Sequence, residues 1–233
     1  MPPGVADSEL DAREDICEQF LQNDTQNLSR LKELFAEVET LLRQLQSDAD
    51  ADQSRCMQTE DNMILLFQVY KGLIQLNIEQ MLEVLVSDRF YVATFGALEW
   101  DPEAMAQGDE RVSNFSSTLH YRDFLTKGVQ FKKIIDLKQA DSPVSSAEQE
   151  CFPHNYSLEE RIHMNYRLTF LKDTVMARYI DEICLKTINQ LITRNNKEIC
   201  SAIFYDGRGY MTPKEIKSIK DQIVEKIKQR DDM

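Results

Sequence analysis

Glycine and proline are scarce in this sequence, and long apolar runs are missing. Seven glycines and six prolines among 233 residues are about half the usual share. Because both residues interrupt regular elements, their scarcity, with abundant Leu, Ile, Glu, Gln and Lys, favours a helical protein. The longest uninterrupted apolar run extends only from Met63 to Phe67, whereas a membrane-spanning helix needs ~20 residues. We therefore expect no membrane partner.

Cysteine and histidine are few and scattered. The three histidines include His154 and His163, which lie near Cys151, but a fourth zinc ligand at a recognised spacing is missing. A loop cysteine with two surface histidines is the favoured interpretation. The five cysteines form no C-x-x-C pair, so no disulfide framework is indicated; they are Cys17, Cys56, Cys151, Cys184 and Cys200. We expect no metal site and no cofactor.

Motifs that carry catalysis are missing as well. The sequence contains no G-x-S-x-G, no P-loop and no G-x-G-x-x-G. The glycines of the predicted turn Asp206 to Gly209 lack a following lysine, and Glu159 with Glu160 is better explained by a helix N-terminus than by acid–base chemistry. We expect no enzyme activity. A hydrolase that uses Cys151, His154 and His163, or an acid pair, stays a minor alternative.

The net charge of −13 is concentrated at the N-terminal end. Residues 1–61 carry 15 acidic and 5 basic side chains, whereas the remaining 172 residues carry 25 and 22. An acidic chain repels phosphate backbones, so nucleic acid is not an expected partner.

The first residues lack the basic flank and apolar stretch of a secretory signal. We expect a location in the nucleus and cytoplasm.

Apolar residues recur at spacings of three and four, which predicts amphipathic helices. Two helices are expected before residue 47, the second with the stripe Leu28–Leu45, followed by an acidic linker at 47–61. After the linker, one helix is expected from Met63 to Leu76. Asn77 is expected to end it and, with Gln80, to form a capping box for the next helix, while Asp101 and Pro102 are expected to stop the third. Further along, Ser157 is expected to cap a helix, another helix is expected around Val175 to Ile180, and Asn195 with Asn196 is expected to break a late one. The predicted fold is all-α, an armadillo or HEAT-like helical repeat array. The predicted domains are 1–61 (acidic helices and linker), 62–205 (helical domain) and 206–233 (C-terminal amphipathic helix).

One predicted helix mixes aromatic and charged groups. Tyr121, Arg122 and Phe124 could form a contact patch for a partner, since tyrosine and arginine are enriched in binding hot spots. The alternative is an ordinary helix in which the aromatic side chains are packed and Arg122 is paired. The same two interpretations apply to Tyr166, Arg167 and Phe170 further along the chain. The residue types alone leave both open.

Three segments follow one another at short spacings. They read FGALEWDPEA (Phe95 to Ala104), HYRDFLTKGVQFKKIIDL (His120 to Leu137) and RIHMNYRLTFLKDTVMARYIDE (Arg161 to Glu182); we name them the three signature segments. Together they resemble the signature of the SMEK (Falafel) family, the regulatory subunit 3 of protein phosphatase 4. The resemblance covers about residues 62 to 205.

The residue-by-residue match is clear in each segment. The first usually reads G-x-L-E-Y-D-P in the family, so Trp100 replaces a tyrosine. The second is typically R-x-F-L followed by F-K-x-V-I, and Arg122 and Phe124 occupy its first positions. The third, R-x-x-Y-L-K-D-x-V-L-A-R, resembles Arg167 to Arg178, and its lysine corresponds to Lys172.

The resemblance implies a non-catalytic regulatory or scaffolding module that positions phosphatase 4 on phosphoprotein targets. Its implied partners are the phosphatase 4 catalytic subunit and its companion regulatory subunit. The candidate partner-binding residues are Tyr121, Arg122, Phe124, Arg167 and Lys172. The family usually begins with a pleckstrin-homology-like domain and continues in further repeats, so we expect a divergent or truncated member with the central SMEK domain only.

A second function is compatible with the same helices. The chain would be a stand-alone helical structural protein that self-associates through the Leu28–Leu45 stripe or the Ile216–Ile227 stripe.

Overall fold

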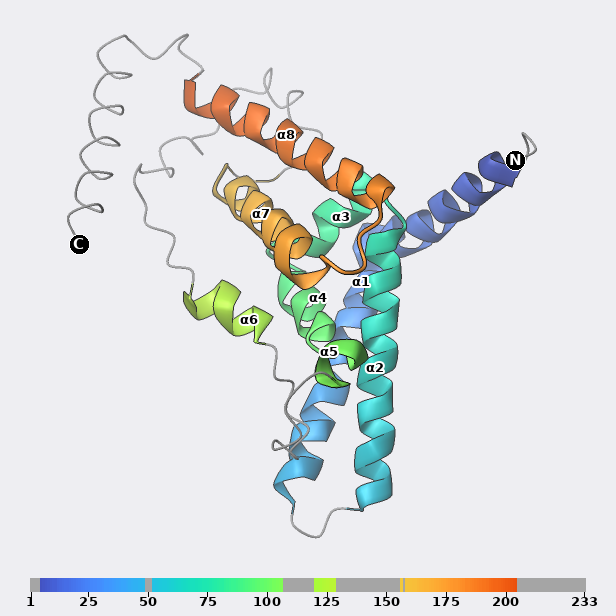
Figure 1. Ribbon diagram of the computed structural model, residues 1–233. Coiled ribbons are helices and arrows are strands. Elements are labelled where there is room, and N and C mark those ends of the chain that lie inside the picture. Colours follow the sequence, from blue (N-terminus) through green and yellow to red (C-terminus); the bar gives the residue numbers. More distant parts are fainter. Residues whose placement is uncertain (1–4, 49–51, 107–119, 129–155, 157, 205–233) are drawn as a thin grey trace, which may run out of the picture. The chain divides into compact units, whose positions relative to one another are not determined.

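The computed structural model describes residues 5–48, 52–106, 120–128, 156 and 158–204, and every regular element within these ranges is helical (Figure 1). The all-α prediction is therefore confirmed, while the armadillo or HEAT-like repeat stays a prediction. The chain forms two compact units, residues 1–131 with 163–192 and residues 132–162 with 193–233. Several predicted features lie outside the described residues: Ser157 as a cap, the turn at 206–209, the Ile216–Ile227 stripe, and Cys151 with His154.

The N-terminal half of the first unit begins with one long helix, α1 (Val5–Ser47), where we expected two. Its backbone departs from helical geometry where the two helices should meet, because Asn23 has a φ of 51° and Thr25 a φ of 61°. Such angles are uncommon in non-glycine residues and strained in a β-branched one. The expected boundary between two helices is therefore a local distortion within the single helix α1.

Helix α1 packs against α2 (Gln53–Gln75), and the two run antiparallel and side by side (Figure 1). Asp52 caps α2 by accepting a hydrogen bond from the Ser54 amide at 2.9 Å. The predicted linker at 47–61 is therefore wrong from residue 53 onward. Thr59 and Glu60 are buried in the helix pair, and this tertiary packing overrides a composition that is typical of loops.

The core of this unit lies where α2 meets α3 (Glu79–Val86) and α4 (Tyr91–Leu98). Asn77 ends α2 as predicted, with a φ of 63°, but the predicted capping box is wrong because Ile78 occupies the N-cap of α3 without a side-chain bond. Each large apolar side chain buried here contributes about 1.5–3 kcal/mol. The fully buried ones include Met63, Tyr70, Ile74, Met81, Leu82, Leu85, Phe95 and Leu98.

Short elements follow α4. Helix α5 (Pro102–Ala106) begins at the expected stop after Asp101, and α6 (Tyr121–Asp123) continues into a π-helical turn, η1 (Phe124–Gly128). Helix α7 (Leu158–Phe170) likewise continues into a π-helical turn, η4 (Leu171–Val175). The expected helix around Val175 to Ile180 is wrong, since Met176 begins a turn that leads to α8 (Glu182–Phe204).

The described part of the second unit comprises the first turn of α7 and the last part of α8. Asn195 is fully buried within α8, so the predicted helix break at Asn195 and Asn196 is wrong. The Arg161 guanidinium donates to the Asn195 side-chain oxygen at 3.5 Å and pairs with Glu198. Because these contacts satisfy the amide oxygen inside the structure, Asn195 does not act as a turn residue.

No described helix combines the length with the apolar composition that a bilayer span requires. Within the described ranges no cluster of three or more potential metal ligands forms either. His163 lies half-buried on α7.

Candidate partner-binding surface

The three signature segments contact one another in the first unit, although they are far apart in the sequence. Phe170 contacts Phe95, which lies 75 residues before it, and Arg178 donates to Asp101, which lies 77 residues before it. The first segment supplies the end of α4 and the start of α5. The second supplies α6 and η1, and the third supplies the end of α7 with η4 and the turn after it. The segments therefore form one structural unit.

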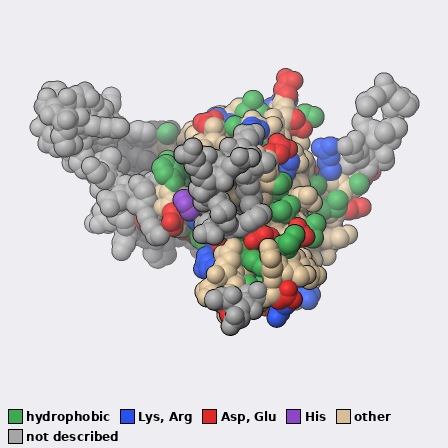
Figure 2. Space-filling model, turned by 60° about the horizontal axis from the view of Figure 1, so that its bottom comes forward, with side chains coloured by type: hydrophobic (Ala, Val, Ile, Leu, Met, Phe, Trp, Pro, Cys, Tyr) green, Lys and Arg blue, Asp and Glu red, His purple; other side chains and the backbone are tan. Residues whose placement is uncertain are grey.

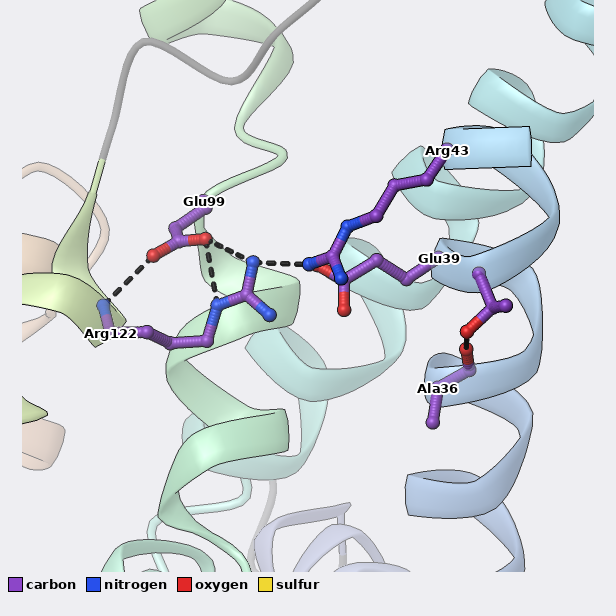
Figure 3. A network of polar contacts seen from close by, with 6 residues as sticks. Ala36, Glu39, Arg43, Glu99 and Arg122 are labelled. Atoms are coloured by element: carbon purple, nitrogen blue, oxygen red, sulfur yellow. Dashed lines mark hydrogen bonds and ion pairs between the residues drawn. The ribbon is translucent and has the colours of Figure 1, made fainter. Parts of the chain in front are cut away.

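Glu99 and Arg122 form the first polar contact of this junction (Figure 3). The Arg122 guanidinium donates two hydrogen bonds to one Glu99 oxygen, at 2.9 Å and 2.7 Å, and the Arg122 backbone amide donates to the other oxygen at 2.8 Å. The same guanidinium reaches Glu39 of α1 at 2.7 Å, and the exposed side chain of Arg43 also pairs with Glu39, at 3.0 Å. One cation thus joins α1, α4 and α6.

The charge of Arg122 is held firmly in this arrangement. Burial disfavours the charged form, but the hydrogen bonds that Arg122 donates to Glu39 and Glu99 outweigh this effect and raise the pKa of Arg122. The Glu99 side chain is only 4% exposed. A nearly buried carboxylate of this kind depends on its cation, because an unpaired buried charge is strongly destabilising.

Asp101 forms the second polar contact. Its carboxylate accepts from the Glu103 amide at 2.9 Å, which caps α5, and also from Arg178 at 2.6 Å and the Tyr179 hydroxyl at 2.7 Å. Burial and the Asp101 carboxylate both raise the pKa of Tyr179, so its hydroxyl stays a donor. The predicted stop at Asp101 and Pro102 therefore has a second role, since it fixes the turn after η4.

Four aromatic side chains cover the junction, and we name them the aromatic surface: Tyr121, Phe124, Tyr166 and Phe170. The Phe124 ring stacks on the Phe170 ring at 4.9 Å, and Tyr121 meets Phe170 edge-on at 5.9 Å. Tyr166 lies four residues before Phe170, hence on the same face of α7. Phe124 is 44% exposed and Tyr166 is 41% exposed. Tyr121, Phe124 and Phe170 therefore pack on one another, as the ordinary-helix interpretation expects, whereas partner binding by this surface stays a prediction.

Arg167 and Lys172, the other two candidates, lie differently. Arg167 is buried; its guanidinium donates to the Val86 carbonyl at 2.8 Å and pairs with Asp88 at 2.6 Å. It also lies 3.7 Å from the centre of the Tyr91 ring. Lys172 is half-buried and donates to the Asn189 side-chain oxygen at 3.3 Å. Partner binding by these residues stays a prediction, and their contacts give both a role inside the fold.

The residues of this junction differ in how visible they are in the sequence. Arg122 and Phe124 are candidates because of their residue types, and Glu99 and Asp101 lie within the first signature segment. Glu39 gives no signal, because it is one of several acids on α1 and meets Arg122 only through the fold. Only the folded chain reveals that α1 takes part.

The surface around the described residues is mixed in charge. On the face seen in Figure 2, acidic and basic side chains are interspersed with hydrophobic ones. Nucleic-acid binding typically uses a basic patch or stripe. The expectation that nucleic acid is not a partner stays a prediction.

Comparison with known proteins identifies the family of this chain. Residues 51–232 match the family described as Phosphatase 4 regulatory subunit 3. The chain belongs to this family. All three signature segments lie within the matched residues, whereas α1 precedes them. The predicted SMEK resemblance is confirmed.

Two curated relatives illustrate the match. The chain is 32% identical over 146 residues to Suppressor of Mek1 of Dictyostelium discoideum, which covers 63% of this chain and 12% of that protein. It is 27% identical over 151 residues to Serine/threonine-protein phosphatase 4 regulatory subunit 3 of Kluyveromyces lactis, which covers 64% of this chain and 17% of that protein. The chain thus matches less than a fifth of the length of either relative. No solved structure is significantly similar to the chain.

Proposed function

We propose that this chain is a non-catalytic module of phosphatase 4 regulation, which binds the phosphatase 4 catalytic subunit or its companion regulatory subunit. The observation that carries the proposal is the family match over residues 51–232. The name of the Kluyveromyces lactis relative, a regulatory subunit, supports the absence of catalysis in the module itself. The metal chemistry of dephosphorylation would belong to the partner.

The proposed mechanism is a gain in effective concentration. A module that holds the phosphatase near a phosphoprotein turns the second encounter into an intramolecular one, which raises the rate without new chemistry. The proposal includes that the module positions the phosphatase on phosphoprotein targets. The proposed location is the nucleus and cytoplasm, and imaging of the tagged full-length protein would test it.

The aromatic surface is the proposed contact for the partner. Phe124 and Tyr166 expose rings on a support that the Glu99–Arg122 and Asp101–Arg178 pairs hold rigid. Exposed tyrosine and arginine near packed aromatics resemble the composition of binding hot spots. Arg178 contributes here too, since its side chain is 43% exposed.

Affinity capture with purified phosphatase 4 catalytic subunit, alone and with its companion subunit, tests the proposal. The wild-type chain should bind at physiological salt, and Phe124→Ala should weaken binding about thirtyfold if Phe124 is a hot spot. Leu65→Ala is the matched control, because Leu65 is 56% exposed on α2 and lies outside the aromatic surface. Equal binding by the two variants would refute the surface, and no binding by the wild type would refute the function.

One observation favours self-association as the second candidate. The Leu28–Leu45 stripe is divided in the structure: Leu28, Phe35 and Leu42 are buried, whereas Leu34 is 48% and Leu41 38% exposed. Light scattering of the wild type and of Leu34→Glu/Leu41→Glu decides the matter. A dimer that the double variant converts to a monomer supports self-association, and a wild-type monomer at all concentrations contradicts it. The Ile216–Ile227 stripe lies outside the described residues.

A further inference from the structure

Helix α6 and the turn η1 span only the eight residues from Tyr121 to Gly128. Isolated helices of fewer than about 12 residues are marginal in water, because nucleation costs more than a few hydrogen bonds return. This segment therefore depends on contacts with other elements. Two of the four residues of the aromatic surface, Tyr121 and Phe124, lie on it.

The contacts that hold the segment come from three directions. Phe170 of α7 supports its two aromatic rings, and Glu99 of α4 binds the backbone amide and guanidinium of Arg122. The third support comes from α1, where Glu39 binds the same guanidinium at 2.7 Å. Of these three supports, only α1 precedes the residues that match the family.

Phe35 and Glu39 act together in this contact, since they lie four residues apart on one face of α1. The Phe35 ring centre is 5.6 Å from the Arg122 guanidinium carbon. Gly96 of α4 makes the approach possible, because a Cβ there would lie 2.7 Å from the Phe35 ring and 2.9 Å from Arg122. The Arg122 side chain therefore lies in a site formed by α1 and α4 together.

We infer that α1 positions the aromatic surface, and that Glu39 is the positioning residue that holds α6 and η1 through Arg122. The inference rests on the proposed function only for the identity of the partner. The order of the segment itself follows from the contacts within the chain. In consequence, a change in α1 weakens partner binding although α1 contributes no side chain to the aromatic surface.

Hydrogen exchange of the intact chain tests the positioning. Glu39→Gln removes the charge and keeps the shape, so exchange of the amides from residue 124 to 128 should become about tenfold faster. Glu37→Gln is the matched control, because Glu37 is exposed on the same helix. Equal exchange in these two variants would overturn the inference.

Arg43→Ala separates the contact with Arg122 from the stability of α1 itself. Arg43 pairs with Glu39 within the helix but is 68% exposed, so its loss should leave exchange at 124–128 unchanged. If Arg43→Ala accelerates exchange as much as Glu39→Gln does, the effect belongs to α1 alone and the inference is wrong.

Capture of the phosphatase 4 catalytic subunit, with its companion subunit where the wild type requires it, separates this inference from the proposed function. If Glu39→Gln both accelerates exchange at 124–128 and weakens binding, the result supports the positioning role of Glu39 and the aromatic surface as the contact. Faster exchange with unchanged binding supports the positioning role of Glu39 and refutes the aromatic surface as the contact. Unchanged exchange overturns the positioning role whatever the binding shows.

Discussion

At the scale of single residues, Arg122 connects α6 with α1 and with the end of α4. It pairs with Glu99 and Glu39, and its own backbone amide also donates to Glu99. Its side chain is 21% exposed and that of Glu99 is 4% exposed. The burial of this ion pair is therefore intermediate. Exposed ion pairs contribute little to stability, whereas breaking a buried ion pair is strongly destabilising.

Replacing Arg122 by Met should lower the free energy of unfolding by about 3 kcal/mol, because the Glu99 carboxylate is left nearly buried without its cation. The double variant Arg122→Met/Glu99→Leu should lose less than the single one, since the charge leaves with its partner. Arg43→Ala should stay within about 0.5 kcal/mol of the wild type. Urea denaturation measures all three, and a double variant less stable than the single would contradict this interpretation.

Two helical glycines offer a matched test of packing. Gly96→Ala should cost about 2 kcal/mol, because the new Cβ overlaps Phe35 and Arg122 at a closely packed position. Gly72→Ala on α2 meets nothing within 4 Å and should gain about 0.5–1 kcal/mol from helix propensity. Thermal unfolding compares the two, and effects of the same sign would show that the approach at Gly96 is looser than described.

At the scale of elements, the N-terminal part of α2 buries a carboxyl group, that of Glu60. Glu60 is 8% exposed, and its neighbours are Cys56, Asp61 and Gln46. Burial raises the pKa of the Glu60 carboxyl; the hydrogen bonds from Cys56 and Gln46 oppose this, and the Asp61 charge adds to it. The ionised form is therefore disfavoured in the folded chain.

This raised pKa predicts a pH dependence with a definite sign. The folded state holds the Glu60 proton more tightly than the unfolded state, so the favourable contribution is complete below the unfolded pKa and is lost as the pH rises through the folded pKa. Glu60→Gln should therefore be more stable than the wild type at pH 7, and the difference should shrink towards pH 4. Denaturation at both pH values measures it, and a difference that grows on acidification contradicts the assignment.

Prediction from sequence succeeds for elements whose signals are local. The apolar spacing predicts α2, α3 and α4, and Asn77 and Asp101 mark real helix ends because their side chains suit turns and caps. It fails where distant contacts decide. Residues 53–61 look like a linker until α1 packs on them, and Asn195 looks like a helix break until Arg161 donates to its side-chain oxygen.

The candidate surface divides in the same way. Arg122 and Phe124 can be singled out from residue type, because charged and aromatic groups alternate on a short helix. The neighbours of these two residues cannot be predicted from the sequence, because Glu39, Glu99 and Phe170 come from three other elements. The family resemblance identifies the signature segments, and only the fold shows that they meet.

At the scale of the whole molecule, the described residues form a helical support whose buried polar contacts hold a partly exposed aromatic surface. Under the proposed function, this support would orient the partner for its reaction. The family match covers most of the chain, and α1 adds a contact that lies outside it.

Hydrogen exchange of the chain with and without saturating phosphatase 4 catalytic subunit and companion subunit tests the central claim most directly. The proposal predicts that protection on binding concentrates at 124–128 and 166–170, with α8 unaffected. Protection elsewhere, with these two segments unchanged, would contradict the aromatic surface as the contact. The absence of any protection at saturating concentrations would contradict binding to phosphatase 4.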